Sequence, residues 1–459
     1  MGAPAVLLYF SMFSFISALY RPAPFAEPVP REEIAPLYSR YRWQMMASAF
    51  WGYAGFYIVR KNFSLAKPYL IHDLHLTTGD VGLIATGLSL AYGISKFVMG
   101  SLSDRSNPRY FMATGLIVSG VINIFFGRLT SVWAMAGWWF LNGWFQGMGW
   151  TPCARTLTHW FSDRERGTKF ALWNTAHNVG GGIAGPIVNV AMAVFGSWAC
   201  AFYVPGVLAV LMGVLIMVFL RDTPQSVGLP PIEEFKDDYP DTGVADRERE
   251  LSSKEILFNF VLNNRLLWVF ACANAFVYVV RYGVLDWAPT YLSAVKGSSH
   301  SLGRWQFFLF EYAGIPGTLL AGWLSDRFFR GRRGPVALLY MILVSAAVLV
   351  YWRNPAGRAW VDATALAAIG FLIYGPVMLI GVAAVDCVPK KAAGTAAGFT
   401  GLFAYMIGDT IAELGIGRAV ERWGWGAGFS IILGSCVLAT LLLALTWRAH
   451  DRGAREASA

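Results

Sequence analysis

The sequence contains few charged residues. Asp, Glu, Lys and Arg make up only 14% of its 459 residues, whereas a soluble domain carries about 25%. This scarcity excludes an ordinary soluble domain. Because 56% of the residues are hydrophobic, we expect a membrane protein.

Sequence patterns for metal binding and covalent catalysis are also missing. The five cysteines are scattered over apolar segments without a CxxC pair, which argues against a disulfide framework and a zinc site. The sequence has no nucleophile elbow and no phosphate-binding glycine loop that opens a soluble helix. We therefore expect a protein that is not an enzyme and binds no metal or cofactor.

Long apolar runs are abundant. Twelve of them approach twenty residues, the length that crosses a hydrocarbon core of roughly 30 Å. They lie near 43–66, 81–101, 110–127, 132–157, 168–195, 199–220, 266–293, 305–325, 335–351, 361–386, 394–417 and 427–447. We expect an all-α membrane protein whose twelve transmembrane helices form two pseudo-symmetric six-helix halves.

The longest polar stretch separates the two sets of runs, and its Pro, Asp and Glu content marks a linker. The expected segments are an N-terminal cytoplasmic or interfacial segment (1–42), the first half (43–220), a central cytoplasmic loop (221–258), the second half (259–447) and a cytoplasmic tail (448–459). Residues 1–20 are apolar, but they lack the flanks of a secretory signal. We expect an interfacial segment there, or a true start at Met12.

The net charge of +9 sets orientation and does not indicate a nucleic-acid partner. The short loops on the side of the central linker hold eleven basic residues, and the six opposite loops hold eight, among them Lys67 and Arg304. Because cytoplasmic loops carry the excess of Lys and Arg, we expect both termini in the cytoplasm.

Two features recur at one offset. "YIVRK" at 57–61 and "YVVRY" at 278–282 place Arg60 and Arg281 221 residues apart. "GSLSDRSNPR" at 100–109 and "GWLSDRFFRGRRG" at 322–334 repeat at an offset of 222. A shared offset predicts two homologous halves with a site at their interface near the middle of the membrane.

The repeated loops contain an acid followed by an arginine, Asp104 with Arg105 and Asp326 with Arg327. A carboxylate can accept from free amides at a helix N-terminus, and an arginine can donate to carbonyls at a C-terminus. We expect these residues to form a cytoplasmic gate. The alternative is a basic loop that only sets orientation.

Each repeated arginine lies inside an apolar run. An arginine at the centre of a span costs roughly 2.5–3.5 kcal/mol, so it must face protein or a water-filled cavity. The deep cations are Arg60, Lys61, Lys96 and Arg281, and the deep acids are Asp286 and Glu311. The surplus of two positive charges predicts an anionic ligand. Phosphate carries about −1.5 to −2 charges, and the planar donors of arginine suit its oxygens.

Polar aromatic residues share a helical face with each arginine. Tyr53, Tyr57 and Arg60 are spaced to lie on one face, and Tyr278 and Arg281 repeat the arrangement. Ordinary packing is the alternative, but both stripes end on the repeated arginine, which favours cavity lining.

A third element is "ALWNTAHNVGGGIAGP" at 171–186. His177 follows Trp173 and Asn174 inside a span, so it could donate to phosphate, or it could be a core histidine bonded to a carbonyl. Gly181 and Gly185 predict close packing against another helix.

Longer motifs resemble a known family. They include "GYAGFYIVRKNF", "GWFQGMGWTPCARTLTHW", "WNTAHNVGGG", "RYGVLDWAPTYL", "FEYAGIPGTL" and "KKAAGTAAGFTGLF". Together they are similar, over nearly the whole chain, to the organophosphate:phosphate antiporter family of the major facilitator superfamily. The resemblance implies a monomer in the bacterial inner membrane that exchanges external glycerol 3-phosphate for internal inorganic phosphate.

The resemblance also implies roles for individual residues. Arg60, Arg281 and His177 would bind the phosphate, and Lys61, Asp286 and Glu311 would form an ion-pair set that rearranges. The implied cavity-lining residues are Tyr53, Tyr57, Tyr92, Lys96, Trp150, Trp173, Asn174, Tyr278, Tyr374 and Tyr405.

Asp409 and Glu413, in the eleventh run, depart from the family pattern. If either faces the cavity, the positive surplus shrinks and proton coupling becomes an alternative to exchange. Two further alternatives are a transporter of hexose phosphate or another organophosphate, and a receptor that senses sugar phosphates.

Overall fold

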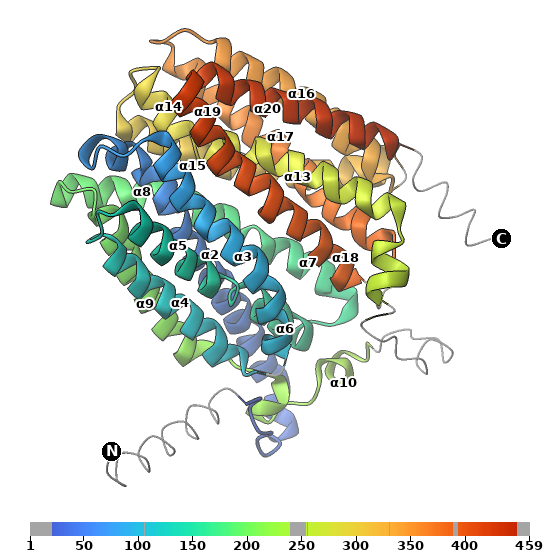
Figure 1. The fold of residues 1–459 in the computed structure, drawn as a ribbon. Coiled ribbons are helices and arrows are strands. Elements are labelled where there is room, and N and C mark those ends of the chain that lie inside the picture. Colours follow the sequence, from blue (N-terminus) through green and yellow to red (C-terminus); the bar gives the residue numbers. More distant parts are fainter. Residues whose placement is uncertain are drawn as a thin grey trace.

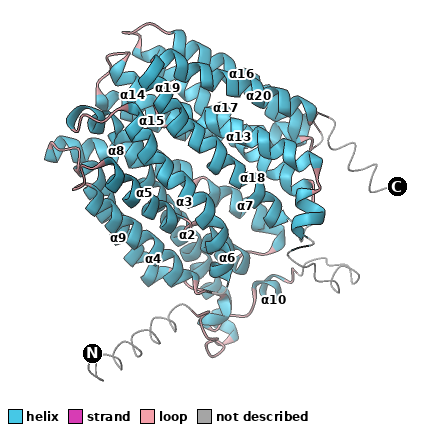
Figure 2. Ribbon diagram, viewed as in Figure 1, coloured by secondary structure: helices cyan, strands magenta, loops and turns pink. Residues whose placement is uncertain are grey.

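The computed structural model describes residues 21–104, 106–238, 254, 256–329, 331–388 and 393–447. Within them the regular secondary structure is helical, without a strand (Figure 2). This confirms the all-α prediction. The expectations for residues 1–20 and for the tail at 448–459 lie outside the described residues.

The first half forms one bundle, drawn from blue to green in Figure 1. Its helices are α2 (Arg31–Asp73), α3 (Thr78–Asp104), α4 (Pro108–Phe126), α5 (Val132–Gln146), α6 (Trp150–Trp160), α7 (Asp163–Asn174), α8 (Ala176–Phe195) and α9 (Cys200–Phe219). α4 packs along α9, α3 along α5, and α2 against both α8 and α9. The pairs α5–α6 and α7–α8 each continue one passage after a short break.

The second half forms the other bundle, drawn from yellow to red in Figure 1. Its helices are α13 (Arg265–Leu285), α14 (Ala288–Ala294), α15 (His300–Phe328), α16 (Arg333–Arg353), α17 (Ala359–Asp386), α18 (Ala393–Phe403), α19 (Ile416–Trp423) and α20 (Trp425–Leu445). Between α18 and α19 the chain forms two π-helical segments, η4 (Ala404–Asp409) and η5 (Ile411–Gly415). π-helical turns are frequent at functional sites.

The buried charged residues lie mainly in the helices that are least typical of a transmembrane span. Eight helices of the described chain are long and apolar enough to cross a membrane. α2 is not among them and contains Arg60, Lys61 and Lys67, and the π-helical passage contains Asp409 and Glu413. These two passages belong to different halves, so the interface between the halves is where charge is buried.

The linker begins with η1 (Pro224–Val227) and α10 (Ile232–Lys236), and η2 (Ile256–Leu262) precedes the second half. We call the side of the molecule that carries residues 221–238 the linker face, and the opposite side the far face. α2 begins at Arg31 rather than near 43, after Pro30 and with Glu32 and Glu33 in its first turn, where acids stabilise a helix N-terminus. The Tyr38 hydroxyl donates to the Pro230 carbonyl at 2.6 Å, so this extension is tied to the linker.

The two halves meet through helix pairs related by the repeat, with α8 against α15 and α3 against α19 and the π-helical passage. A Cβ at Gly185 would lie 2.7 Å from the Arg304 carbonyl oxygen, and one at Gly181 would lie 2.9 Å from Glu311 Oε1. The close packing predicted for this glycine pair is therefore present. Near the far face, Thr78 Oγ1 donates to the Gly417 carbonyl at 2.9 Å.

Two basic residues are not where the loop count placed them. Lys67 lies inside α2 and is fully buried, and Arg304 lies inside α15 with 5% of its surface exposed. Assigning them to far-face loops was wrong, because both helices continue beyond the apolar runs and the charges find partners across the interface. Removing them from the count of far-face loops increases the excess of basic residues on the linker face.

Candidate functional site

The repeated arginines lie in matching positions of the two halves, Arg60 on α2 and Arg281 on α13. Their exposed fractions are 5% and 2%. The Arg60 guanidinium carbon lies 4.5 Å from the Tyr92 ring centre and 5.4 Å from that of Tyr405. Such cation–π contacts hold an arginine without neutralising its charge.

Arg281 is held in a similar way. Its Nη2 donates to the Tyr374 hydroxyl at 3.1 Å, and its guanidinium carbon lies 4.9 Å from the Tyr282 ring centre. Tyrosines also connect the two arginines, since the Tyr278 and Tyr405 rings are 5.3 Å apart and each of them contacts one guanidinium. The two halves therefore bring their arginines to one cluster of tyrosines.

Neither arginine has a tight carboxylate partner among the described residues. The contact from Arg60 Nη2 to Asp409 Oδ2 is 4.0 Å long, and Asp409 also accepts from Ser89 Oγ at 2.6 Å. Arg281 has no ion pair in this part of the chain, and its buried Nε has no hydrogen-bond partner. A buried guanidinium with unused donors is suited to an anion that brings its own oxygens.

His177 lies between the two sets of aromatic residues. Its ring centre is 5.5 Å from that of Tyr57 and 5.6 Å from that of Tyr374. Its Nδ1–H donates to the Asn174 carbonyl, which orients the ring. The carbonyl bond expected of a core histidine is present, but the side chain is only half-buried and stands between tyrosines from both halves.

The remaining predicted lining residues extend from the arginines toward the linker face. The Tyr53 and Trp173 rings are 4.9 Å apart, and Trp150 lies 6.2 Å from Trp173. Lys96 Nζ is 5.4 Å from the Trp150 ring centre. The structure thus brings the predicted aromatic set and Lys96 to one region.

The predicted ion-pair set is divided between two places. Lys61 Nζ donates to both oxygens of Asp286, at 2.7 and 2.9 Å, across the two halves. Glu311 is not in this ion pair. It accepts from Asn178 Nδ2 at 3.2 Å and from the Tyr374 hydroxyl, and its Oε1 has no partner.

Sequence reasoning missed a second ion pair across the halves. Lys67 Nζ lies 2.5 Å from Glu413 Oε2, and both side chains are buried. With Lys67 and Arg304 included, the deep charges of the described interface are six cations and four carboxylates, so the positive surplus is two, as predicted, but it rests on a different set of residues. Tyr282 was also missed, although its spacing of four residues from Tyr278 continues the same helical stripe.

Three of the carboxylates form a cluster. Oxygens of Asp286, Asp409 and Glu413 lie within 4.8 Å of one another. Each faces a cation from α2, so ion pairs and not metal ligation account for the cluster.

The expected gate residues are only partly described. Asp326 pairs with Arg333 at 2.5 Å, and Arg333 also reaches Asp386 at 3.5 Å. These contacts join α15, α16 and α17 within the second half, while Arg327 is exposed. Arg105 and the side chain of Asp104 lie outside the described residues.

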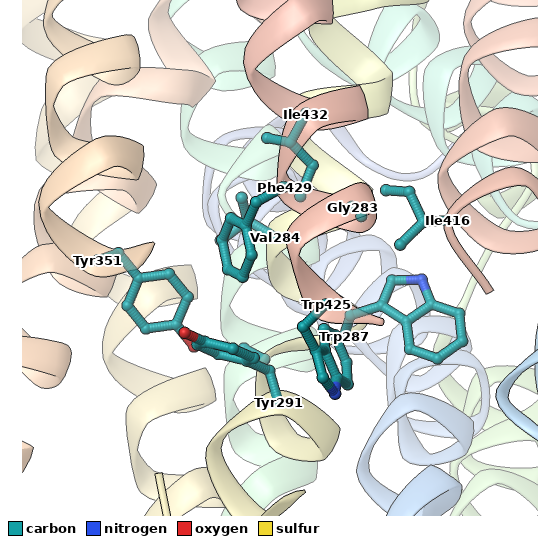
Figure 3. Close-up of a pocket in the computed structure, with 11 residues that line it drawn as sticks. Gly283, Val284, Trp287, Tyr291, Tyr351, Ile416, Trp425, Phe429 and Ile432 are labelled. Atoms are coloured by element: carbon teal, nitrogen blue, oxygen red, sulfur yellow. The ribbon is translucent and has the colours of Figure 1, made fainter. Parts of the chain in front are cut away.

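An aromatic pocket in the second half is part of the core. Figure 3 shows Trp287, Tyr291 and Trp425 around it, and its volume is about 10 Å³. That volume is near the lower limit for a single water, so the pocket has no room for a phosphate.

Two six-helix halves around a buried site with a matching residue from each half define a secondary transporter of the membrane. Comparison with known proteins agrees with this class. The model of the Major Facilitator Superfamily matches residues 49–413, and the chain belongs to this superfamily, within the organophosphate:phosphate antiporter family that its motifs resemble.

Individual relatives cover almost the whole chain. A glycerol-3-phosphate transporter of Bacillus subtilis is 53% identical over 95% of this chain and 98% of its own length. A probable hexose phosphate transport protein of Chlamydia pneumoniae is 45% identical over 93% of this chain and 95% of its own length. The fold is also similar to a solved structure, a bacterial homologue of the human lysosomal transporter Spinster in an inward-facing and unoccupied conformation. The TM-score is 0.71 at 16% sequence identity, and the match covers 88% of this chain and 95% of that chain.

Proposed function

We propose that this protein takes up glycerol 3-phosphate in exchange for inorganic phosphate by alternating access. The observation that carries the proposal is the pair of buried arginines, one from each half, that lack tight carboxylate partners. A relative named as a glycerol-3-phosphate transporter and 53% identical to this chain supports the choice of substrate.

The phosphate group would bridge the two halves. Arg60 and Arg281 would each offer paired donors to its oxygens, with His177 and the nearby tyrosine hydroxyls as further donors. Bound phosphate supplies the negative charge that the site lacks, so it favours the state in which both arginines are close. An empty site leaves two guanidinium groups facing each other as the halves move, which disfavours the return step. Obligate exchange follows from this difference.

The orientation follows from the loop charges. The basic excess on the linker face supports a cytoplasmic location for that face and for both termini.

Contacts between the halves such as Thr78–Gly417 and Lys67–Glu413 lie toward the far face, which supports a conformation open to the cytoplasm. For the site to open to the other side, the pairs Lys61–Asp286 and Lys67–Glu413 must separate. All these groups belong to one chain, so a monomer suffices.

The test is counterflow in proteoliposomes loaded with unlabelled phosphate. The wild type should take up labelled glycerol 3-phosphate without a pH gradient. R60K and R281K should each reduce uptake at least a hundredfold, because a lysine cannot replace the planar pair of donors. R128K, at an exposed arginine of the far face, is the control and should leave uptake unchanged. Uptake that is equal in liposomes without internal phosphate would reject exchange.

A proton-coupled symporter is the second candidate, favoured by Asp409, 4.0 Å from Arg60. A symporter would accumulate substrate into phosphate-free liposomes when the outside is acidic, and it would lose this activity in D409N. Competition of glycerol 3-phosphate and glucose 6-phosphate against labelled phosphate would identify the preferred organophosphate.

A further inference from the structure

A groove runs along the membrane-facing surface of the first half, between α2 and α9. It has a volume of about 420 Å³, which falls within the range of roughly 300–1,000 Å³ typical of small-ligand sites. The groove is lined by Gln44, Ala47, Ser48, Trp51 and Gly52 of α2 and by Met212, Leu215, Ile216 and Phe219 of α9. Its lining is almost entirely apolar, and it is separate from the arginine site.

The residues along the groove face outward. Trp51, Leu215 and Phe219 are each about half exposed, at 51%, 53% and 48%. Small residues of α2 keep the two helices from filling the space between them. In a membrane this surface is covered by lipid tails, which are as apolar as the groove lining, so an acyl chain fits the groove by shape and the specificity must come from the head group.

One end of the groove lies at the level of the membrane surface. Gln44 Nε2 donates to the Phe219 carbonyl at 2.6 Å and closes the groove on the side of the linker face. The neighbouring Trp43 is 70% exposed, as is common for tryptophan at the boundary between lipid and water. A lipid whose chain lay in the groove would therefore place its head group beside Gln44.

Two arginines cap the C-terminal end of α9, Arg221 directly after the helix and Arg109 from the neighbouring α4. Arg221 Nη1 donates to the carbonyls of Val218 and Leu220, at 2.7 and 3.0 Å, and Arg109 Nε donates to the Met217 carbonyl. Both arginines thus cover the C-terminus of α9 and leave their Nη2 groups without a partner among the described residues. Neither makes an ion pair with an acid in this part of the chain. Burial and the neighbouring Arg109 lower the pKa of Arg221, as expected for two cations close together.

We propose that the α2–α9 groove binds an anionic phospholipid, with an acyl chain along the groove and the head-group phosphate on Arg109 and Arg221. Basic residues beside helices at the cytoplasmic surface recognise anionic head groups in this way. The chain's own residues 1–20 are the competing occupant, since residue 23 is tied to Asp222 next to Arg221. That segment contains no acidic residue, so it cannot neutralise the two arginines, whereas a lipid phosphate can.

The experiment measures lipid retention and thermal stability of the purified full chain in mild detergent. Phosphatidylglycerol should be retained and should raise the melting temperature, and phosphatidylcholine should do neither. R109Q and R221Q should each weaken phosphatidylglycerol binding roughly fivefold, and the double variant roughly 25-fold. A47W fills the groove without touching the arginines and should weaken binding to a similar degree.

Controls separate this site from general lipid contact. R128Q removes an exposed arginine of the far face, and V207W adds the same bulk at an exposed position of α9 outside the groove. Both should bind phosphatidylglycerol as the wild type does. Circular dichroism and melting without added lipid identify any variant that fails to fold.

Five results would overturn the proposal. Phosphatidylglycerol binding at the wild-type level in the double arginine variant and in A47W would show that the groove is not the site. Equal stabilisation by phosphatidylcholine would exclude head-group recognition, and equal stabilisation by inorganic phosphate through the same arginines would assign them to a free anion. Lipid binding that appears only after deletion of residues 2–20 would make that segment the occupant, and a dimer dissociated by A47W would make it a second copy.

Discussion

Lys67 of α2 and Glu413 of η5 form an ion pair of 2.5 Å that joins the two halves of the molecule, and both side chains are buried. The pair stands beside Lys61–Asp286, which also connects the first half to the second. In both pairs the cation belongs to the first half and the carboxylate to the second. The contact of Arg60 with Asp409 has the same arrangement.

Removing one partner of the Lys67–Glu413 pair should destabilise the protein strongly. K67M or E413Q leaves a buried group without its partner, and such losses cost about 3–5 kcal/mol when a charge remains. Melting in detergent measures the effect. The double variant K67M/E413L should recover most of the loss, because two apolar side chains leave no orphaned charge. A double variant that melts no higher than the single ones would contradict the ion pair.

Replacing Asp409 should tighten anion binding. Asp409 offers Arg60 a negative charge 4.0 Å away, so it competes with the ligand for that guanidinium. D409N should therefore lower the Kd for phosphate roughly tenfold, since charges at this distance interact by up to about 4 kcal/mol in a partly screened site. Turnover should slow because phosphate leaves less readily. Competition binding against labelled phosphate tests the first effect, and an unchanged or weaker affinity would refute it.

Tyr374 should support the site through its hydroxyl. It accepts from Arg281 and donates to Glu311, so Y374F removes both contacts and keeps the ring. We expect phosphate affinity to fall roughly tenfold, because a lost hydrogen bond to a charged group costs about 1.5–3 kcal/mol. Y340F is the matched control, since the buried Tyr340 hydroxyl has no partner in the described chain. Equal affinities in the two variants would exclude this role for Tyr374.

Bulk at Gly185 should separate the halves. A Cβ there would lie 2.7 Å from the Arg304 carbonyl oxygen, and backbone atoms of α15 cannot move aside cheaply. G185V should reduce stability by about 1–3 kcal/mol, as overpacked sites do, and should abolish transport. At Gly434 of α20 the space around a Cβ is open, so G434A serves as the control. Normal transport by G185V would show that α8 and α15 need not pack closely.

Most of the fold follows from local features of the sequence. Apolar runs locate most of the passages to within a few residues, because each one must cover the hydrocarbon thickness, but they miss the twelve residues by which α2 extends toward the linker face. The repeated arginines could be recognised as candidate site residues for a related reason, since a charge inside such a run is costly and usually marks a functional site. The spacing of Gly181 and Gly185 likewise predicted a close contact between two helices.

Contacts between charged residues that are far apart in the sequence could not be predicted in this way. Lys67 follows an apolar run and resembles a loop residue until Glu413, 346 residues later in the chain, is known to face it. Glu311 looked like a partner for Lys61, but in the structure it faces Asn178 and Tyr374. Such pairings depend on how the two halves dock, and the spacing of residues within one helix carries no information about docking.

The division of charge between the halves has a consequence for the evolution of the chain. The repeat indicates two copies of one ancestral bundle, yet the buried acids of the interface, Asp286, Glu311, Asp409 and Glu413, all belong to the second copy. Two first copies placed together would bring like charges of their α2 helices face to face, with no carboxylates to separate them. The duplicated units have thus become complementary and can no longer substitute for each other.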